Sequence, residues 1–310
     1  ALGGAGNGTF ELRPVKARDE AEAAEQANAE RLAIIKKYRK MAKHPELFAV
    51  EVAWTDEWLA PDFLRARAAG TQLAWRELLD EHLTGRVFSF PLLTDAFCDL
   101  LTEEILNFYS SGLPVRRPNS MNNYGIILSD IGLAALVDGL QELLAPLGEL
   151  LWPSGPGLGW DDHHCFIVRY REGEDLGLDM HHDDSDVTFN VCLGRAFGGA
   201  GLQFCGMLGS PSHRKQQFTY HHERGRCVVH AGTHRHGADD ISWGERLNLI
   251  LWNRSSAYRQ SDDFENPPYE AEEVMPDRVC LSYTHDRDYG AFKAYEPGKE
   301  HFASSAWCPP

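Results

Sequence analysis

The chain has 310 residues, of which 43% are hydrophobic and 25% charged, a composition typical of a soluble globular protein with a substantial core. Asp and Glu total 46 against 30 for Lys and Arg, and the net charge of −16 argues against a nucleic-acid partner. No apolar run approaches the roughly 20 residues that a membrane-spanning helix requires, so we expect no membrane partner.

The seven cysteines are scattered along the chain and are never spaced as Cys-x-x-Cys. This spacing argues against a zinc ribbon and against a thioredoxin-like motif. Four of the cysteines lie in apolar, strand-like stretches, where a free cysteine usually behaves as a small buried hydrophobe. The pattern favours a soluble protein in an intracellular, reducing compartment.

The first predicted helix lies near the N-terminus. Residues 1–10 are rich in glycine and are predicted to be disordered, whereas apolar residues recur at the helical period over 21–43, and the run ends at His44. This helix is acidic first and basic last, an order that suits the helix dipole. Its lysines and arginines therefore indicate a solvated face, and we assign them no partner.

Further helices and one strand are predicted in the next part of the chain. A second amphipathic segment covers 73–83, and the alternation at 87–90 predicts a strand. Thr94 is a candidate N-cap for the helix that follows. A third helical periodicity runs from 131 to 151, and Pro146 is expected to kink it.

Beyond residue 160 the pattern changes to short apolar alternations separated by Gly-rich or polar turns. The predicted strands are 163–170, 187–193, 202–205, 226–230 and 246–252. Helices followed by many short strands predict an α+β protein in which helices support a β-sandwich or jelly roll. The predicted parts are an N-terminal helical extension (1–84), a main domain with flanking helices (85–255) and a C-terminal extension on or near the barrel (256–310).

A group of potential metal ligands follows residue 180. His181 and Asp183 form a His-x-Asp pair, and a distant histidine lies at His236. Two histidines and one carboxylate on one face of a metal leave the opposite face open, as in non-haem Fe(II) oxygenases. In extended chain His181 and Asp183 share a face and His182 points away, but His182 and Asp184 have the same spacing. The spacing leaves both registers open.

Arg246 begins the last predicted strand, ten residues after His236. A buried arginine is unfavourable unless an anion meets it, so Arg246 is a candidate anchor for a carboxylate, with a structural ion pair as the alternative. Tyr170 ends the strand 163–170; its hydroxyl either shares that carboxylate or caps the core, and the sequence alone favours the structural role. The polar segment 119–124 either lines a substrate entrance or is a structural loop.

Three segments resemble the Fe(II)- and 2-oxoglutarate-dependent oxygenases of the prolyl and lysyl hydroxylase class. They are 116–125, the His181-His182-Asp183 stretch leading into 187–194, and 247–252. The narrower resemblance is to the 2-oxoglutarate and iron-dependent oxygenase domain-containing protein 2 family, over roughly residues 85–254. It implies a double-stranded β-helix, the cupin-like jelly roll, with supporting N-terminal helices.

The same resemblance selects one ligand set from the alternatives. It implies that His181 and Asp183 bind Fe(II) and that His236, in preference to His230 and His234, is the distal ligand. In this ligand set Asp183 supplies the one carboxylate.

The resemblance also implies a co-substrate and a reaction. Arg246 would anchor 2-oxoglutarate with the help of Tyr170, and His181, Asp183, His236 and Arg246 would form the catalytic set. With O2, the enzyme would hydroxylate an unactivated C–H of a peptidyl prolyl or lysyl side chain and release succinate and CO2, with ascorbate as a further cofactor. The alternatives are a free amino acid or small metabolite as substrate, and a non-catalytic metal-binding jelly-roll interaction module.

Overall fold

The computed structural model describes residues 13–49, 54–207, 210–213 and 215–265. The predicted disorder of residues 1–10, and most of the predicted C-terminal extension, lie outside the described residues. The helices are α1 (Arg13–Tyr38), α2 (Pro61–Ala69), α3 (Gln72–Leu78), α4 (Asp95–Ser110), α5 (Ala134–Leu151), α6 (Ser256–Arg259) and α7 (Asp262–Glu265), with short 3-10 helices η1 (Pro45–Phe48) and η2 (Leu128–Ile131).

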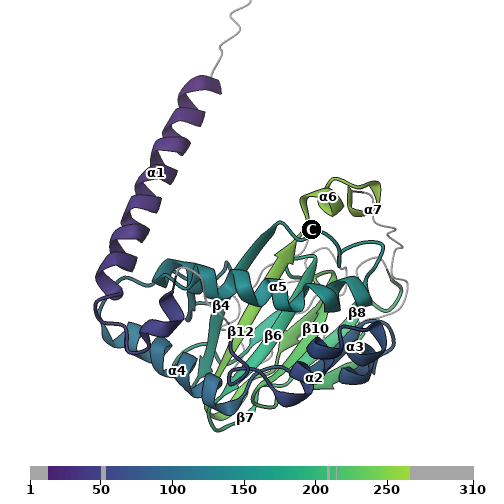
Figure 1. Ribbon diagram of the computed structural model, residues 1–310. Coiled ribbons are helices and arrows are strands. Elements are labelled where there is room, and N and C mark those ends of the chain that lie inside the picture. The colour runs from purple at the N-terminus through teal and green to yellow at the C-terminus, as the bar shows by residue number, and fades with distance from the viewer. Residues whose placement is uncertain (1–12, 50–53, 208–209, 214, 266–310) are drawn as a thin grey trace, which may run out of the picture.

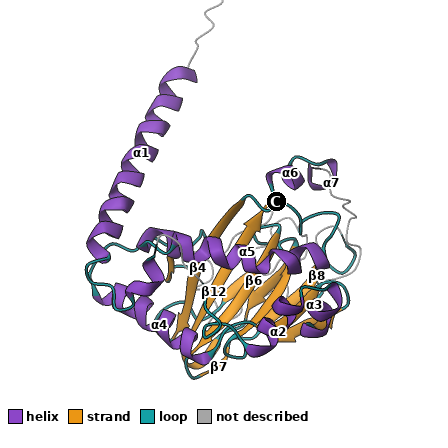
Figure 2. Ribbon diagram, viewed as in Figure 1, coloured by secondary structure: helices purple, strands orange, loops and turns teal. Residues whose placement is uncertain are grey.

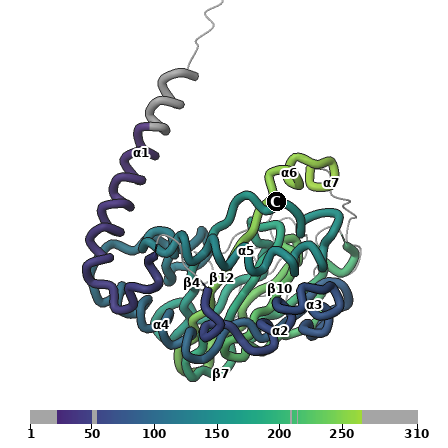
Figure 3. Tube along the Cα trace, viewed as in Figure 1, coloured from purple at the N-terminus to yellow at the C-terminus, as the bar shows by residue number. Residues whose placement is uncertain are grey.

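Helix α1 projects from the body of the molecule, and its C-terminal end joins the other helices (Figures 1 and 3). Tyr38, the last residue of α1, donates its hydroxyl hydrogen bond to the buried carboxylate of Glu104 in α4. The remaining long helices, α4 and α5, lie across one face of the large sheet (Figure 2). One layer of helices therefore covers one side of the β-structure.

The helix predictions are confirmed in part. Thr94 caps α4 as predicted, because its hydroxyl accepts the backbone N–H of Phe97 at 3.3 Å. The single amphipathic segment predicted over 73–83 is wrong, since α3 ends at Leu78 and a strand follows. The reason is Gly85, whose φ of 69° allows a turn that pairs this strand with the next one instead of extending the helix.

The strands form two antiparallel sheets. The larger sheet has the order β1 (Asp80–Leu83), β2 (Val87–Pro91), β10 (Arg226–Ala231), β6 (Val187–Gly194), β12 (Ile241–Arg254), β4 (Asp162–Arg171), β3 (Gly125–Ile127), and β7 (Phe197–Gly199) pairs with β12. The smaller sheet has the order β5 (Leu178–His181), β11 (His234–Ala238), β8 (Leu202–Met207), β9 (Phe218–Tyr220).

The chain alternates between these sheets. It passes from β4 in the larger sheet to β5 in the smaller one and back to β6, and it repeats this step from β10 through β11 to β12. At these four steps the chain crosses from one sheet to the other, which is the connectivity of a jelly roll. The fold is a double-stranded β-helix with supporting helices, and the predicted fold class is confirmed.

Alternation along β12 determines which side chains face the interior. Its three leucines, Leu247, Leu249 and Leu251, belong to the core that the larger sheet shares with the helices. The intervening residues point to the opposite side, where Ile250 packs with Phe166, Val168 and Tyr170 of β4 between the two sheets. This alternation directs Arg246 of β12 to the inner side, where Tyr170 of β4 also lies.

Two composition-based expectations can be compared with the described residues. Three cysteines that lie in strands, Cys165, Cys192 and Cys227, are free and buried, as expected for small hydrophobes, and Cys98 of α4 is free and buried as well. Within the described ranges, no helix combines the length and apolarity that crossing a membrane requires.

Candidate metal centre and adjoining cavities

Strands β5 and β11 bring the two candidate histidines together. His236 of β11 is the direct antiparallel partner of His181, the last residue of β5, and the ring centroids are 4.4 Å apart. Asp183 follows β5 by two residues, and its backbone N–H donates to the carbonyl of Gly232 at 3.0 Å. One ligand atom from each of His181, Asp183 and His236 lies within 4.8 Å of the other two.

Hydrogen bonds fix how both imidazoles are oriented. Nδ1 of His181 lies 2.6 Å from the carbonyl oxygen of Asp179, and Nδ1 of His236 lies 2.8 Å from that of His234. Since a carbonyl only accepts, each Nδ1 carries the proton, and each Nε2 keeps its lone pair. These Nε2 atoms face Asp183, at 3.3 Å from His181 to Oδ1 and 3.6 Å from His236 to Oδ2. A hydrogen bond from Nδ1 to a backbone carbonyl is typical of a histidine that binds metal through Nε2.

The electrostatics of the cluster suit a divalent cation. Burial raises the pKa of Asp183, but nearby His236 and His181 outweigh that effect and hold the pKa below its usual range. Burial lowers the pKa of His236 to about 4, which the charge of Asp183 only partly opposes. At neutral pH the cluster thus presents one carboxylate and neutral imidazole, the protonation states that metal binding requires.

Two side chains support the carboxylate from behind. The hydroxyl of Thr188 donates to Oδ2 of Asp183 at 2.6 Å, and the hydroxyl of Ser185 lies 2.6 Å from that of Thr188. Thr188 belongs to β6, so the larger sheet holds a ligand that follows the smaller one. The sequence prediction missed Thr188; its signal was a hydroxyl within a mostly apolar strand.

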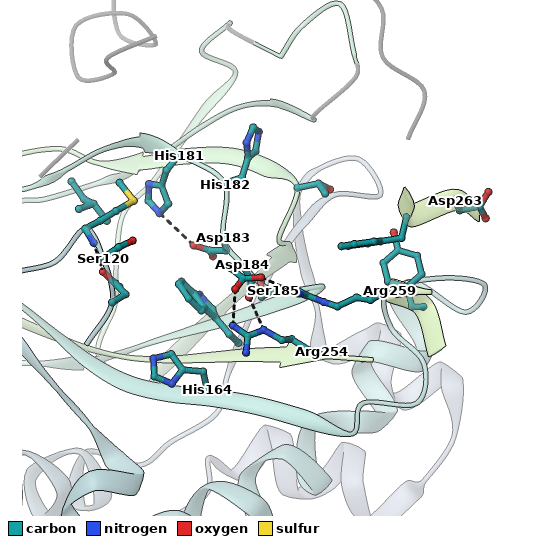
Figure 4. Close-up of a pocket in the computed structure, with 17 residues that line it drawn as sticks. Ser120, His164, His181, His182, Asp183, Asp184, Ser185, Arg254, Arg259 and Asp263 are labelled. Carbon is teal, nitrogen blue, oxygen red and sulfur yellow. Dashed lines mark hydrogen bonds and ion pairs between the residues drawn. The ribbon is translucent and has the colours of Figure 1, made fainter. Parts of the chain in front are cut away.

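The alternative pair, His182 and Asp184, is not part of a metal cluster among the described residues. His182 points away from the cluster (Figure 4). Its Nε2 lies 2.8 Å from Nε2 of His213, and the two rings are stacked. The Asp184 carboxylate instead accepts hydrogen bonds from Arg254 at 3.0 Å and from Arg259 at 2.9 Å.

The other distal histidines are engaged elsewhere. His234 directs Nε2 to the carbonyl of Cys205 at 2.7 Å. His230 packs its ring against that of His236 at 4.4 Å and directs Nδ1 to the Ala231 carbonyl. Neither joins the cluster that His236 completes.

A small cavity of about 40 Å³ adjoins the cluster. Its walls include His181, Asp183 and His236 together with Arg246 and Tyr170. Arg246 is 1% exposed, pairs across the sheet with Tyr170, and places its guanidinium carbon 4.6 Å from the centre of the Tyr170 ring. Every sequence-predicted site residue therefore lines one cavity.

Arg246 has no acidic partner among the described residues. One of its terminal nitrogens donates to the Ala200 carbonyl, and Nε has no hydrogen-bond partner there. Burial lowers its pKa, because the charged form is desolvated without a compensating carboxylate. Arg169, in the neighbouring strand, is by contrast held by Glu174 at 2.7 and 2.6 Å. Arg246 is thus a buried cation with room for an external anion.

A larger cavity of about 890 Å³ also borders His181 and Asp183 (Figure 4). Its wall includes Asn119, Ser120 and Met121 of the polar loop. Its rim includes residues from α6 and α7, namely Tyr258, Arg259, Asp263 and Phe264. Arg259 of this rim is hydrogen-bonded to the loop after β5, because it donates to Asp184 and, at 2.8 Å, to Asp186.

A jelly roll that presents two histidines and one carboxylate on its inner wall, beside a buried arginine, defines the 2-His-1-carboxylate class of metal-dependent proteins. A family model described as the OGFOD2-like domain matches residues 34–157. A zebrafish (Danio rerio) 2-oxoglutarate and iron-dependent oxygenase domain-containing protein 2 is 35% identical over 240 residues, which cover 75% of this chain and 68% of the relative. The chain belongs to the 2-oxoglutarate and iron-dependent oxygenase domain-containing protein 2 family.

Two further comparisons give the extent of the likeness. The human protein of the same name is 38% identical over 226 residues, covering 70% of this chain and 65% of the human protein. A Pseudomonas putida prolyl-4-hydroxylase structure is 20% identical with a TM-score of 0.41, covering 56% of this chain and 94% of that one. The chain spans 53% to 68% of the length of the curated family members that it matches.

Proposed function

We propose that this chain is an Fe(II)- and 2-oxoglutarate-dependent dioxygenase that hydroxylates an unactivated C–H of its substrate. The observation that carries the proposal is that one cavity contains two different binding elements. They are the His181–Asp183–His236 cluster and Arg246, which has no acidic partner among the described residues. In this proposal the cluster holds Fe(II), and Arg246 and Tyr170 hold the distal carboxylate of 2-oxoglutarate. With Fe(II), 2-oxoglutarate and O2 bound, the centre would supply the oxidant for hydroxylation and leave succinate and CO2.

The number of ligands supports an enzyme over a structural metal site. A structural site is usually closed by four protein ligands, whereas an oxygenase keeps positions open for its substrates. Among the described residues the cluster contains one ligand atom each from His181, Asp183 and His236. A non-catalytic metal-binding module is therefore the weaker alternative.

The substrate that we propose is a peptidyl prolyl or lysyl side chain. Support comes from the resemblance to prolyl and lysyl hydroxylases, and from the cavity of about 890 Å³ that opens beside His181 and Asp183. A cavity of this size accepts a side chain together with part of a peptide backbone. A free amino acid or a small metabolite would also enter it, and ascorbate as a further cofactor stays a prediction.

An anaerobic titration tests the proposal without knowledge of the substrate. Fe(II) and then 2-oxoglutarate are added to metal-free protein, and we expect the visible charge-transfer band of a chelated 2-oxo acid. The band should be lost in His181→Ala and kept in His182→Ala, a matched control one residue away that lies outside the cluster. Iron binding without a band would contradict the oxygenase assignment and favour a closed structural site.

A second expectation concerns the residue behind the metal carboxylate. Thr188→Val keeps the shape of the side chain but removes the hydrogen bond to Asp183, so Fe(II) affinity should fall by about tenfold or more. Thr188→Ser retains a hydroxyl and should restore most of the affinity. Competition with a chelator of known strength measures both variants; equal affinities for Thr188→Val and the wild type would show that this contact does not orient the ligand.

A further inference from the structure

The loop before β3 contains two asparagines, Asn119 and Asn122, and the backbone fixes the amide orientation of Asn119. Oδ1 of Asn119 lies 2.9 Å from the backbone nitrogen of Met121 and 2.7 Å from that of Asn122. A backbone N–H only donates, so the atom that meets both must be the amide oxygen. The NH2 group of Asn119 must therefore point to the other side.

The orientation of the Asn119 amide determines the direction of the hydrogen bonds that follow. Nδ2 of Asn119 donates to Oδ1 of Asn122 at 2.9 Å, and Nδ2 of Asn122 in turn donates to the hydroxyl oxygen of Tyr170 at 3.1 Å. The Tyr170 oxygen is thus an acceptor in this chain of hydrogen bonds. Its own proton remains available, because no acceptor for it is found among the described residues.

The surroundings of Tyr170 indicate which kind of acceptor its hydroxyl proton can reach. Asn122 is 1% exposed and Tyr170 is 2% exposed, and both line the small cavity with Arg246. Burial raises the pKa of Tyr170 to about 12, so the phenol keeps its proton at neutral pH. The guanidinium beside the ring is a cation and cannot accept a hydrogen bond. A carboxylate in the cavity would accept from the Tyr170 hydroxyl and from the guanidinium of Arg246, which donates to the Ala200 carbonyl and whose Nε has no hydrogen-bond partner among the described residues.

We infer that Asn119 and Asn122 are positioning residues that make Tyr170 a hydrogen-bond donor to the carboxylate bound by Arg246. The inference rests on the proposed function, since that carboxylate is the distal group of 2-oxoglutarate. It assigns a role to the loop that the sequence left open between substrate entrance and structural loop. Because Asn119 lines the large cavity as well as the small one, the loop forms part of the wall between them.

The test compares two 2-oxo acids. In Asn122→Ala, we expect 2-oxoglutarate to bind Fe(II)-loaded protein about fivefold more weakly, as for loss of one hydrogen bond. Pyruvate has the same 2-oxo acid end but no distal carboxylate, so its affinity should not change. Both affinities are measured by anaerobic absorption titration, without turnover. Equal weakening for the two acids would overturn the inference, because it would indicate general damage to the site.

A double-mutant cycle separates positioning from a structural effect. If Asn122 acts through the Tyr170 hydroxyl, Asn122→Ala should cause no further loss of 2-oxoglutarate affinity in a Tyr170→Phe background. Additive losses would overturn the inference. Asn119→Ala, which breaks the relay without contacting Tyr170, should weaken 2-oxoglutarate binding in the same direction and should likewise have no effect in that background.

Controls distinguish the failure of this inference from the failure of the proposed function. Asn123 lies on the same loop, but its side chain donates to Asp175 at 2.9 Å outside the small cavity, so Asn123→Ala should leave both affinities unchanged. If wild-type protein does not bind 2-oxoglutarate, the proposed function itself fails. If wild type binds it and Asn122→Ala binds it equally well, only the relay is rejected.

Discussion

Asp183→Ala is expected to abolish iron-dependent turnover while the protein stays folded. Asp183 is the only anionic member of the cluster, and its two oxygens face the Nε2 atoms of His181 and His236. Without it, two neutral imidazoles must hold a divalent cation with no charge compensation. Iron bound per chain, succinate formed from 2-oxoglutarate, and the far-ultraviolet circular dichroism spectrum measure the loss and the retained fold.

Asp184→Ala is the matched control for this experiment. The two aspartates are adjacent, but the Asp184 carboxylate binds Arg254 and Arg259 on the rim of the large cavity. The Asp184 variant should retain iron and lose at most a modest part of its activity. If Asp184→Ala removed iron and Asp183→Ala did not, the ligand register would have to be shifted by one residue.

Replacing Arg246 with methionine should have opposite effects on co-substrate binding and on stability. We expect 2-oxoglutarate affinity to fall by at least about tenfold, because a charge-assisted hydrogen bond contributes roughly 1.5–3 kcal/mol. The same change removes a buried cation that has no acidic partner among the described residues, so the ligand-free protein should unfold at a higher temperature. Titration with 2-oxoglutarate and thermal unfolding without it test the two parts.

Arg169→Met gives the contrasting control. Arg169 is also buried, but Glu174 neutralises it through two hydrogen bonds. Its loss leaves that pair incomplete, with only Arg171 still bound to Glu174, so stability should fall while 2-oxoglutarate affinity is kept. An Arg246→Met variant that behaved like Arg169→Met in both measurements would mean that Arg246 has a structural role only.

The choice between the two His-x-Asp registers shows how far sequence reasoning reaches. Spacing gave His181–Asp183 and His182–Asp184 equal weight, and only family resemblance separated them. The structural reason is long-range, since the arginines that bind Asp184 lie 70 and 75 residues further along the chain. No local pattern contains such a contact.

The predicted strands were mostly those of the larger sheet, because their sequences alternate between apolar and polar residues more clearly. The strand β12 alternates leucines with inward-facing residues, which gives a clear period of two. By contrast, β11 reads His-Arg-His-Gly-Ala, so no alternation of apolar and polar residues marks it although all five residues are buried. The strands β5 and β9 have only four and three residues. Tertiary packing, and not local preference, makes these segments strands.

The direct pairing of His181 with His236 has a consequence for how the protein folds. The two residues are far apart in sequence, and they meet only when β11 has docked beside β5 in the smaller sheet. Contacts between distant segments form late, because a long loop must close first. Metal capture should therefore follow closure of the barrel and not guide it, so iron would bind only chains that have already completed the smaller sheet.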